Sequence, residues 1–132
     1  MTTKAFEEKT IKLNEATIQC RKDGIIHVVF NEGTEVNVEL QYKLLNLYIE
    51  LCEGDKRLFM FSAHSGVSIT KEARDNSEKI ESVYPAIATA VVADSVAYTL
   101  VANFYLKINK PKSPYKVFRE IASAEAWLKT FN

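Results

Sequence analysis

The side chains best suited to chemistry in this 132-residue chain are a histidine and the hydroxyls that follow it. His64 lies in the stretch SAHSG, directly after an apolar run, with Ser65 beside it and Ser68 and Thr70 close behind. Ligands of open α/β sheets bind beyond the carboxyl ends of the strands, so these four side chains are candidate ligand-binding residues. The alternative is a polar loop in which Gly66 makes a turn and Ser68 or Thr70 caps the next helix.

Other residue types that support catalysis or metal binding are sparse. His27 stands inside the apolar run IIHVVF, where a packed or strand-exposed side chain is expected rather than a catalytic base. The sequence has no GxSxG elbow, HExxH pair, Walker loop or GxGxxG turn. Cys20 and Cys52 are its only cysteines, and their spacing is neither a CxxC pair nor a metal-binding pattern. We expect two reduced thiols, no catalytic residue, no metal and no cofactor; a disulfide and a hydrolase using His64 are the alternatives.

The charges of the chain balance, but their placement is uneven. Lys plus Arg number 17 and Asp plus Glu also number 17, so the formal net charge is zero. A nucleic-acid partner is therefore not expected, and the aromatic stacking motifs of RNA-binding folds are missing as well. The stretch NFYLKINKPKSPYKVFR, residues 103–119, carries cations without an acid, among them Lys107, Lys110 and Lys112. It is either a solvated loop or a surface for an anionic partner or lipid headgroup.

The first half of the chain predicts a hairpin and a helix. The segment TIKLNEATIQC alternates so that Ile18 and Cys20 face inward, as in a half-buried edge strand. The pair Asp23-Gly24 then predicts a turn into an antiparallel strand, IIHVVF. Asn37 is the expected cap of a helix that Gly54 ends. The inward face of that helix is predicted to contain Leu40, Leu44, Leu47, Tyr48 and Leu51, widened by Leu45, Ile49 and Cys52.

The second half alternates strands and helices. RLFMFSA has the unbroken apolar run of a central parallel strand, and the next helix is expected to run to about Val83, before Pro85. AIATAVVA is a further apolar strand, and a third helix is expected from Asp94 or Ser95 to about Leu106. YKVF is a short strand, and the chain closes with a helix over about residues 120–131.

The expected third helix is more apolar than a surface helix needs to be. A helix on a monomer buries only about 100° of its circumference, whereas apolar side chains cover more than half of this one. The helix is either deeply buried or has a surplus face, formed by Tyr98, Val101 and Tyr105, that contacts a partner. That face, with the neighbouring Lys107, Lys110 and Lys112, is the candidate partner surface.

The element order β-β-α-β-α-β-α-β-α predicts a single α/β domain over residues 1–132. Alternating strands and helices indicate crossover units, hence a mainly parallel sheet with an antiparallel N-terminal hairpin and covering helices. The N-terminus has acids where a signal peptide needs an apolar run, and no stretch approaches the roughly 20 apolar residues of a membrane helix. We therefore expect a cytoplasmic protein.

Three segments add a resemblance to a known family. ITKEAR at 69–74, ADSVAYTLVANFYLKINKP at 93–111 and AEAWL at 124–128 resemble small stand-alone bacterial STAS-like proteins of unassigned function. The resemblance implies the fold of anti-sigma-factor antagonists, which CRAL-TRIO lipid-binding domains partly share. Those antagonists carry a phosphate-accepting serine at the start of the second helix, where this chain has Thr70-Lys71-Glu72-Ala73. The acceptor position holds Lys71 or Glu72, so the resemblance does not extend to that phosphorylation switch.

These observations predict a non-enzymatic regulatory or protein-interaction module of STAS-like type, with a homodimer through the third helix as one form of contact. The alternative is a small lipid- or metabolite-binding protein of the CRAL-TRIO-related kind. Its ligand would lie beyond the strand ends near His64 or beneath the third helix.

Overall fold

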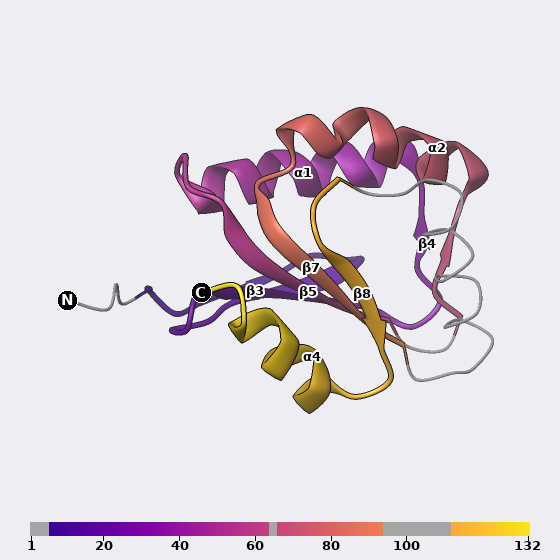
Figure 1. Cartoon of the computed structure of the whole chain (residues 1–132). Helices are drawn as coiled ribbons and strands as arrows, with labels where there is room; N and C mark the ends of the chain where they lie inside the picture. Colours follow the sequence, from indigo (N-terminus) through magenta and orange to yellow (C-terminus); the bar gives the residue numbers. More distant parts are fainter. Residues whose placement is uncertain (1–5, 64–65, 94–111) are drawn as a thin grey trace.

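The computed structural model describes residues 6–63, 66–93 and 112–132 as an α/β domain around one central sheet (Figure 1). Six strands form that sheet in the order β1-β2-β3-β5-β7-β8. They are β1 (Lys9–Lys12), β2 (Ala16–Cys20), β3 (Ile25–Phe30), β5 (Arg57–Ala63), β7 (Ala86–Ala93) and β8 (Tyr115–Phe118). Two further short strands, β4 (Glu35–Val36) and β6 (Ser68–Ile69), pair with each other in parallel.

The N-terminal antiparallel hairpin is confirmed, but it is longer than the sequence predicted. Ile18 and Cys20 of β2 are buried, and β2 pairs antiparallel with β3 across the turn that contains Gly24 at φ 91°. β2 is nevertheless not an edge strand, because β1 pairs antiparallel on its outer side. The pattern of β1 is weak since three of its four residues are exposed, and an exposed edge strand leaves little alternation to detect.

The remaining strands are parallel, as the alternating element order predicted. β5 lies between β3 and β7, and β8 pairs with β7. The run from Leu58 to Met60 in β5 is buried, which agrees with a central strand covered on both faces.

Helices cover both faces of the sheet. Figure 1 shows α1 (Val38–Cys52) and α2 (Lys71–Ile80) over one face and α4 (Ile121–Lys129) against the other. Phe59 belongs to the core beneath α1, whereas Met60, the next residue of the strand, packs with Ala124 and Leu128 of α4. This division follows from the period of two in a strand, which sends successive side chains to opposite faces.

The ends of the first two helices are set by side-chain caps. Asn37 Oδ1 accepts a hydrogen bond from the backbone N–H of Leu40 at 2.8 Å, and Thr70 Oγ1 accepts one from Ala73 N–H at 3.1 Å. Both caps agree with the sequence prediction, with Thr70 rather than Ser68 as the cap of α2. A short 3₁₀ turn, Glu81–Val83, extends α2 to the predicted end of the segment. The helix α1 ends at Cys52, followed by Glu53 and Gly54 with positive φ.

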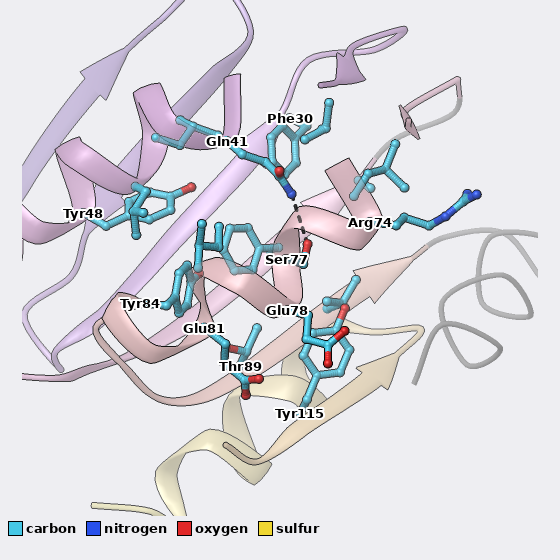
Figure 2. Close-up of a pocket in the computed structure, with 18 of the residues that line it drawn as sticks. Phe30, Gln41, Tyr48, Arg74, Ser77, Glu78, Glu81, Tyr84, Thr89 and Tyr115 are labelled. Atoms are coloured by element: carbon cyan, nitrogen blue, oxygen red, sulfur yellow. Dashed lines mark hydrogen bonds between the residues drawn. The ribbon is translucent and has the colours of Figure 1, made fainter. Parts of the chain in front are cut away.

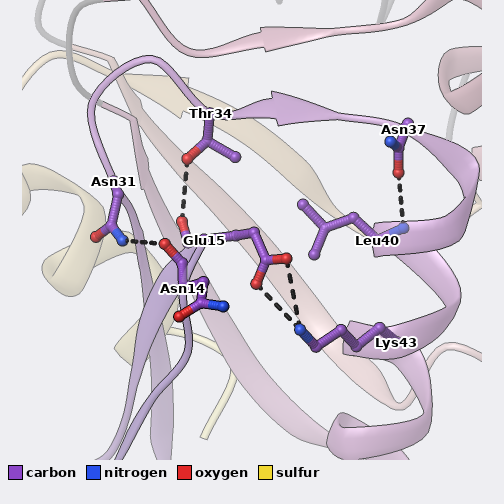
Figure 3. A network of polar contacts seen from close by, with 7 residues as sticks. All are labelled: Asn14, Glu15, Asn31, Thr34, Asn37, Leu40 and Lys43. Atoms are coloured by element: carbon purple, nitrogen blue, oxygen red, sulfur yellow. Dashed lines mark hydrogen bonds and ion pairs between the residues drawn. The ribbon is translucent and has the colours of Figure 1, made fainter.

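A network of polar contacts ties the β1–β2 turn to the start of α1 (Figure 3). Asn31 Nδ2 donates to the carbonyl oxygen of Asn14 at 2.7 Å, and Thr34 Oγ1 donates to that of Glu15 at 3.1 Å. The Glu15 carboxylate also pairs with Lys43 Nζ of α1 at 3.1 Å. An exposed ion pair contributes little, so the backbone-directed bonds are the main restraint on this corner.

The inward face of α1 differs from the prediction at two positions. Ile49 was expected to widen this face, but its side chain is 44% exposed because it lies beyond the arc that the sheet covers. Gln41 was not expected there, yet it is buried. Its amide forms hydrogen bonds to α2, which removes the desolvation cost that otherwise keeps glutamine at the surface.

Two other expectations concern the thiols and the segment after β7. Cys20 and Cys52 are both free and buried. The expected third helix, with Tyr98, Val101 and Tyr105, lies outside the described residues, as do Lys107 and Lys110. Within the described ranges, no helix is long and apolar enough to cross a membrane.

Candidate functional site

A partly enclosed cavity of about 260 Å³ lies between the helix pair α1 and α2 and the sheet (Figure 2). We call it the α1–α2 chamber. Leu44, Leu45 and Tyr48 of α1 form one wall, and Ser77 and Ile80 of α2 form another. The sheet contributes the floor through Phe61, Thr89, Val91 and Tyr115, and the segment from Val67 to Ile69 borders the carboxyl ends of the strands. The chamber therefore extends along the helix-covered face of the sheet, from the carboxyl ends of β3 and β5 at Phe30 and Ala63 to Tyr84, which precedes β7.

Aromatic rings form part of the chamber wall, which Tyr48, Phe61 and Tyr84 line. Phe59 does not line the chamber but packs against these rings. The Tyr48 ring meets Phe59 edge-on at a centroid distance of 5.1 Å and Tyr84 at 5.9 Å. Phe61 lies 6.2 Å from Tyr48 in a similar edge-on arrangement. Edge-to-face contacts at such distances are favourable and hold the rings in fixed orientations. The apolar wall of the chamber is therefore preformed.

Two tyrosine hydroxyls in this wall have no hydrogen-bond partner among the residues that the structure describes. They are Tyr48 Oη and Tyr84 Oη, and both oxygens are out of reach of solvent. Burial raises the pKa of Tyr48 and of Tyr84 far above the usual value of a phenol, and the nearby Tyr48 raises that of Tyr84 further. Both side chains therefore keep their protons, and each O–H donor is enclosed by protein atoms rather than open to the cavity.

The polar lining from α1 and α2 is, by contrast, already engaged. Gln41 Nε2 donates to Ser77 Oγ at 3.0 Å (Figure 2). It also donates to the carbonyl oxygen of Ala73 at 2.8 Å. Asn76 Nδ2 donates back to Gln41 Oε1 at 3.1 Å, and Ser77 Oγ bonds Ala73 O at 3.0 Å. This network fixes α2 against α1 and so sets the width of the chamber.

Three of the described residues that line the chamber are charged, namely Arg74, Glu78 and Glu81. Glu81 is held by the chain itself, since its carboxylate accepts hydrogen bonds from the backbone N–H groups of Lys112 and Ser113. Glu78 is exposed, and Figure 2 shows the Arg74 guanidinium directed away from the cavity. The other described residues that line the chamber are uncharged.

The four predicted ligand-binding residues have different locations. Ser68, in β6, lines the chamber, whereas the Thr70 hydroxyl is used as the cap of α2. His64 and Ser65 lie outside the described residues. Of the predicted partner surface, only Lys112 is described, and its side chain is exposed.

A serine–histidine pair occurs elsewhere, on the α4 face of the sheet. His27 Nε2 lies 2.7 Å from Ser62 Oγ, and both residues are buried. Desolvation lowers the pKa of His27, and Arg21 lowers it further, against a smaller opposing effect of Glu125. The residue types match a nucleophile and its base, but the pair lies within the packed strands and outside the chamber. Its geometry is that of a neutral, hydrogen-bonded core histidine, as the sequence predicted.

The thiols and acids of the described residues do not supply a reactive centre either. Burial raises the pKa of Cys52 to about 11 and also raises that of Cys20, which makes both thiolates scarce at neutral pH. In the part of the chain that the structure describes, no group of three His, Cys, Asp or Glu side chains is placed to hold a metal ion.

The sequence predicted Tyr48 to face inward but gave no role to Tyr84. The signal that could have identified both is chemical: a tyrosine at a core position needs a partner for its hydroxyl, and no polar residue was predicted on the same face. The contact of these two rings at one cavity requires the tertiary structure, because Tyr48 comes from α1 and Tyr84 from the loop before β7.

Comparisons with known proteins give a family and a fold. A family model described as "Domain of unknown function (DUF7793)" matches residues 18–132. No curated protein matches the chain. Among solved structures, an uncharacterised protein of the DUF3478 family from Shewanella loihica PV-4, with a SpoIIAA-like fold, superposes with a TM-score of 0.59 at 9% identity. The superposition covers 97% of this chain and 98% of the other. The predicted STAS-like fold is thereby confirmed, and the likeness at this identity concerns the fold alone.

Proposed function

Because the chain belongs to the DUF7793 family, whose description assigns no activity, we propose from the site itself that it is a non-enzymatic regulatory module of STAS-like type. It works by binding, and the α1–α2 chamber is its recognition site. The observation that carries this proposal is the cavity between the helix pair and the sheet, whose described lining residues are mostly apolar.

The chemistry of the chamber favours binding over catalysis. The Tyr48 and Tyr84 hydroxyls keep their protons at neutral pH, so neither acts as a base or a nucleophile. Gln41 and Ser77 are committed to the contacts between α1 and α2. The chamber therefore binds a ligand mainly through apolar surface. Each methylene group that the ligand buries contributes about 0.8 kcal/mol of favourable binding free energy.

A chemically neutral probe tests whether the chamber admits a ligand at all. Benzene and xenon bind in dry apolar cavities without any hydrogen bond, so we expect benzene to shift the methyl NMR signals of Leu44, Leu45 and Val91. The variant Val91→Phe places a larger ring on the chamber floor and should abolish these shifts. Ile121→Phe, on the exposed side of α4, is the matched control and should leave them unchanged. Wild-type protein whose spectrum does not respond to benzene would refute the proposal.

A protein partner is the second candidate, and the STAS-like fold together with the apolar sequence of residues 94–106 supports it. Its surface would be Tyr98, Val101 and Tyr105 with the adjacent lysines, as predicted from the sequence. Light scattering after size-exclusion chromatography tests the homodimer form. A dimer that Tyr98→Ser with Val101→Ser converts to a monomer supports it, and a wild-type monomer at all concentrations counts against it.

A further inference from the structure

The last strand of the sheet has an outer edge that lies apart from the chamber. Among the described strands, β8 stands at one end of the sheet and pairs only with β7 (Figure 1). We propose that this edge binds an extended, acidic segment of another protein by adding it to the sheet as a further strand. Such binding is independent of whether the chamber takes a ligand.

The backbone of β8 leaves hydrogen-bonding groups on the outer side. Thr89 of β7 lies opposite Tyr115, and its N–H donates to the carbonyl oxygen of Pro114 at 2.9 Å. Successive residues of a strand direct their backbone groups alternately to its two sides, so Pro114 and Lys116 face β7 and Val117 faces outward. No strand of the described residues pairs with the N–H and C=O of Val117. An unpaired edge of this kind can accept a strand from another chain.

The charges along this edge are positive. Residues 112–119, KSPYKVFR, contain Lys112, Lys116 and Arg119 and no acid. All three side chains are exposed, and neither Lys116 nor Arg119 forms an ion pair with another described residue. The opposite edge of the sheet, at β1, is mixed, because residues 7–15 hold three acids and two lysines. The edge at β8 is therefore the one suited to an acidic strand.

The two faces of β8 also differ in charge. Tyr115 lines the chamber together with Glu78 and Glu81, so acids border the strand on that face. Lys116, the next residue, points to the opposite face, where its Nζ lies 5.5 Å from the centroid of the Phe118 ring. Phe118 packs with the core beneath α4. A bound strand should therefore direct its carboxylates to the α4 face and uncharged side chains to the chamber face.

A second copy of the chain is a poorer occupant of this edge. Two β8 strands paired antiparallel around Val117 would bring the three cations of one copy close to those of the other. Like charges that meet across a strand pair are destabilising, and lysines on edge strands commonly prevent such self-pairing. An acidic strand converts this repulsion into attraction. The charge that opposes a dimer therefore favours a partner of opposite charge.

Fluorescence anisotropy of a labelled peptide on the full chain tests the proposal. The probe is an extended peptide of alternating glutamate and valine, Glu-Val-Glu-Val-Glu-Val-Glu, whose carboxylates share one face of a strand. We expect binding that weakens as salt is added, since exposed charges supply part of the affinity. Lys116→Glu should weaken binding roughly fivefold or more, because an attraction becomes a repulsion. The amide NMR signal of Val117 should shift during the titration.

Two controls separate the edge from the overall charge of the protein. Lys12→Glu is the matched variant, because Lys12 is an exposed lysine of β1, the strand at the other edge of the same sheet. It changes the net charge by the same amount as Lys116→Glu, yet it should alter the affinity less than about twofold. A peptide with every backbone nitrogen methylated keeps the carboxylates but loses the N–H donors, so it should not bind measurably.

Several results would overturn the proposal. Wild-type protein that does not bind the peptide at low salt would refute it. Equal weakening by Lys116→Glu and Lys12→Glu would show attraction to the overall charge, and undiminished binding of the methylated peptide would exclude strand addition. A single-stranded RNA that competes as well as the peptide would show recognition of any polyanion. A wild-type dimer that the peptide dissociates would assign the edge to a second copy of the chain.

Discussion

Removal of the Tyr48 hydroxyl should stabilise the ligand-free protein, although Tyr48 is one of its most buried side chains. Loss of a buried polar atom normally destabilises a protein because its partner is left unpaired. Tyr48 Oη has no partner among the described residues, so Tyr48→Phe leaves no described group unsatisfied. The ring contacts with Phe59 at 5.1 Å and Tyr84 at 5.9 Å are retained.

The size of the stability change in Tyr48→Phe follows from the desolvation of the hydroxyl. An unpaired buried donor costs roughly 1–3 kcal/mol, and the void left by one oxygen atom offsets part of this gain. We expect a net increase of about 1 kcal/mol in the free energy of unfolding. For a domain of this size, that corresponds to a rise in Tm of about 4 °C.

Urea unfolding followed by circular dichroism measures the change directly. The transition midpoint should rise at an unchanged slope, because the area exposed on unfolding is nearly the same. Tyr42→Phe should move the midpoint slightly the other way, since its hydroxyl has a partner in Asn76. A loss of stability in Tyr48→Phe larger than that in Tyr42→Phe would show that the Tyr48 hydroxyl is paired in solution and would refute the reasoning.

Three further predictions concern the cap of α2, the hydrogen bonds between α1 and α2, and the buried histidine His27. Thr70→Ala should lower the free energy of unfolding by about 1 kcal/mol through loss of the α2 cap, and Thr70→Ser should restore most of it in thermal unfolding. Gln41→Leu should lower the free energy of unfolding in urea by about 2 kcal/mol, because Asn76 and the Ala73 carbonyl lose their hydrogen-bond partner. An unchanged urea midpoint would show that these hydrogen bonds do not stabilise the protein. The lowered pKa of His27 predicts stability that is fully present above pH of about 6.5 and declines as the pH falls toward its folded value, since the unfolded state then binds more protons. His27→Gln should remove this decrease in the free energy of unfolding below about pH 6.5. If the variant shows the same pH dependence as wild type, the decrease arises from other titratable groups.

The sequence alone determined most of the secondary structure and the topology. Alternating apolar strands and amphipathic helices required crossover connections and so a mainly parallel sheet, and the cap at Asn37 fixed the start of α1. These features follow from local chemistry and from periods of 2 and 3.6 residues, which need no knowledge of distant contacts. β1 was missed because its side chains are mostly exposed and leave little apolar pattern.

Only the tertiary structure decided the candidate site. Ser68 was predicted beside a ligand and does line the chamber, but the chamber wall depends on where α1 and α2 lie relative to the sheet. Gln41 is buried only because α2 supplies acceptors for its amide. Tyr48 and Tyr84, far apart in the chain, face one cavity because the crossover between β5 and β7 brings the end of α2 back against α1. Periodicity predicts which face of an element is buried, whereas the partner of each buried polar atom is fixed only when the elements pack.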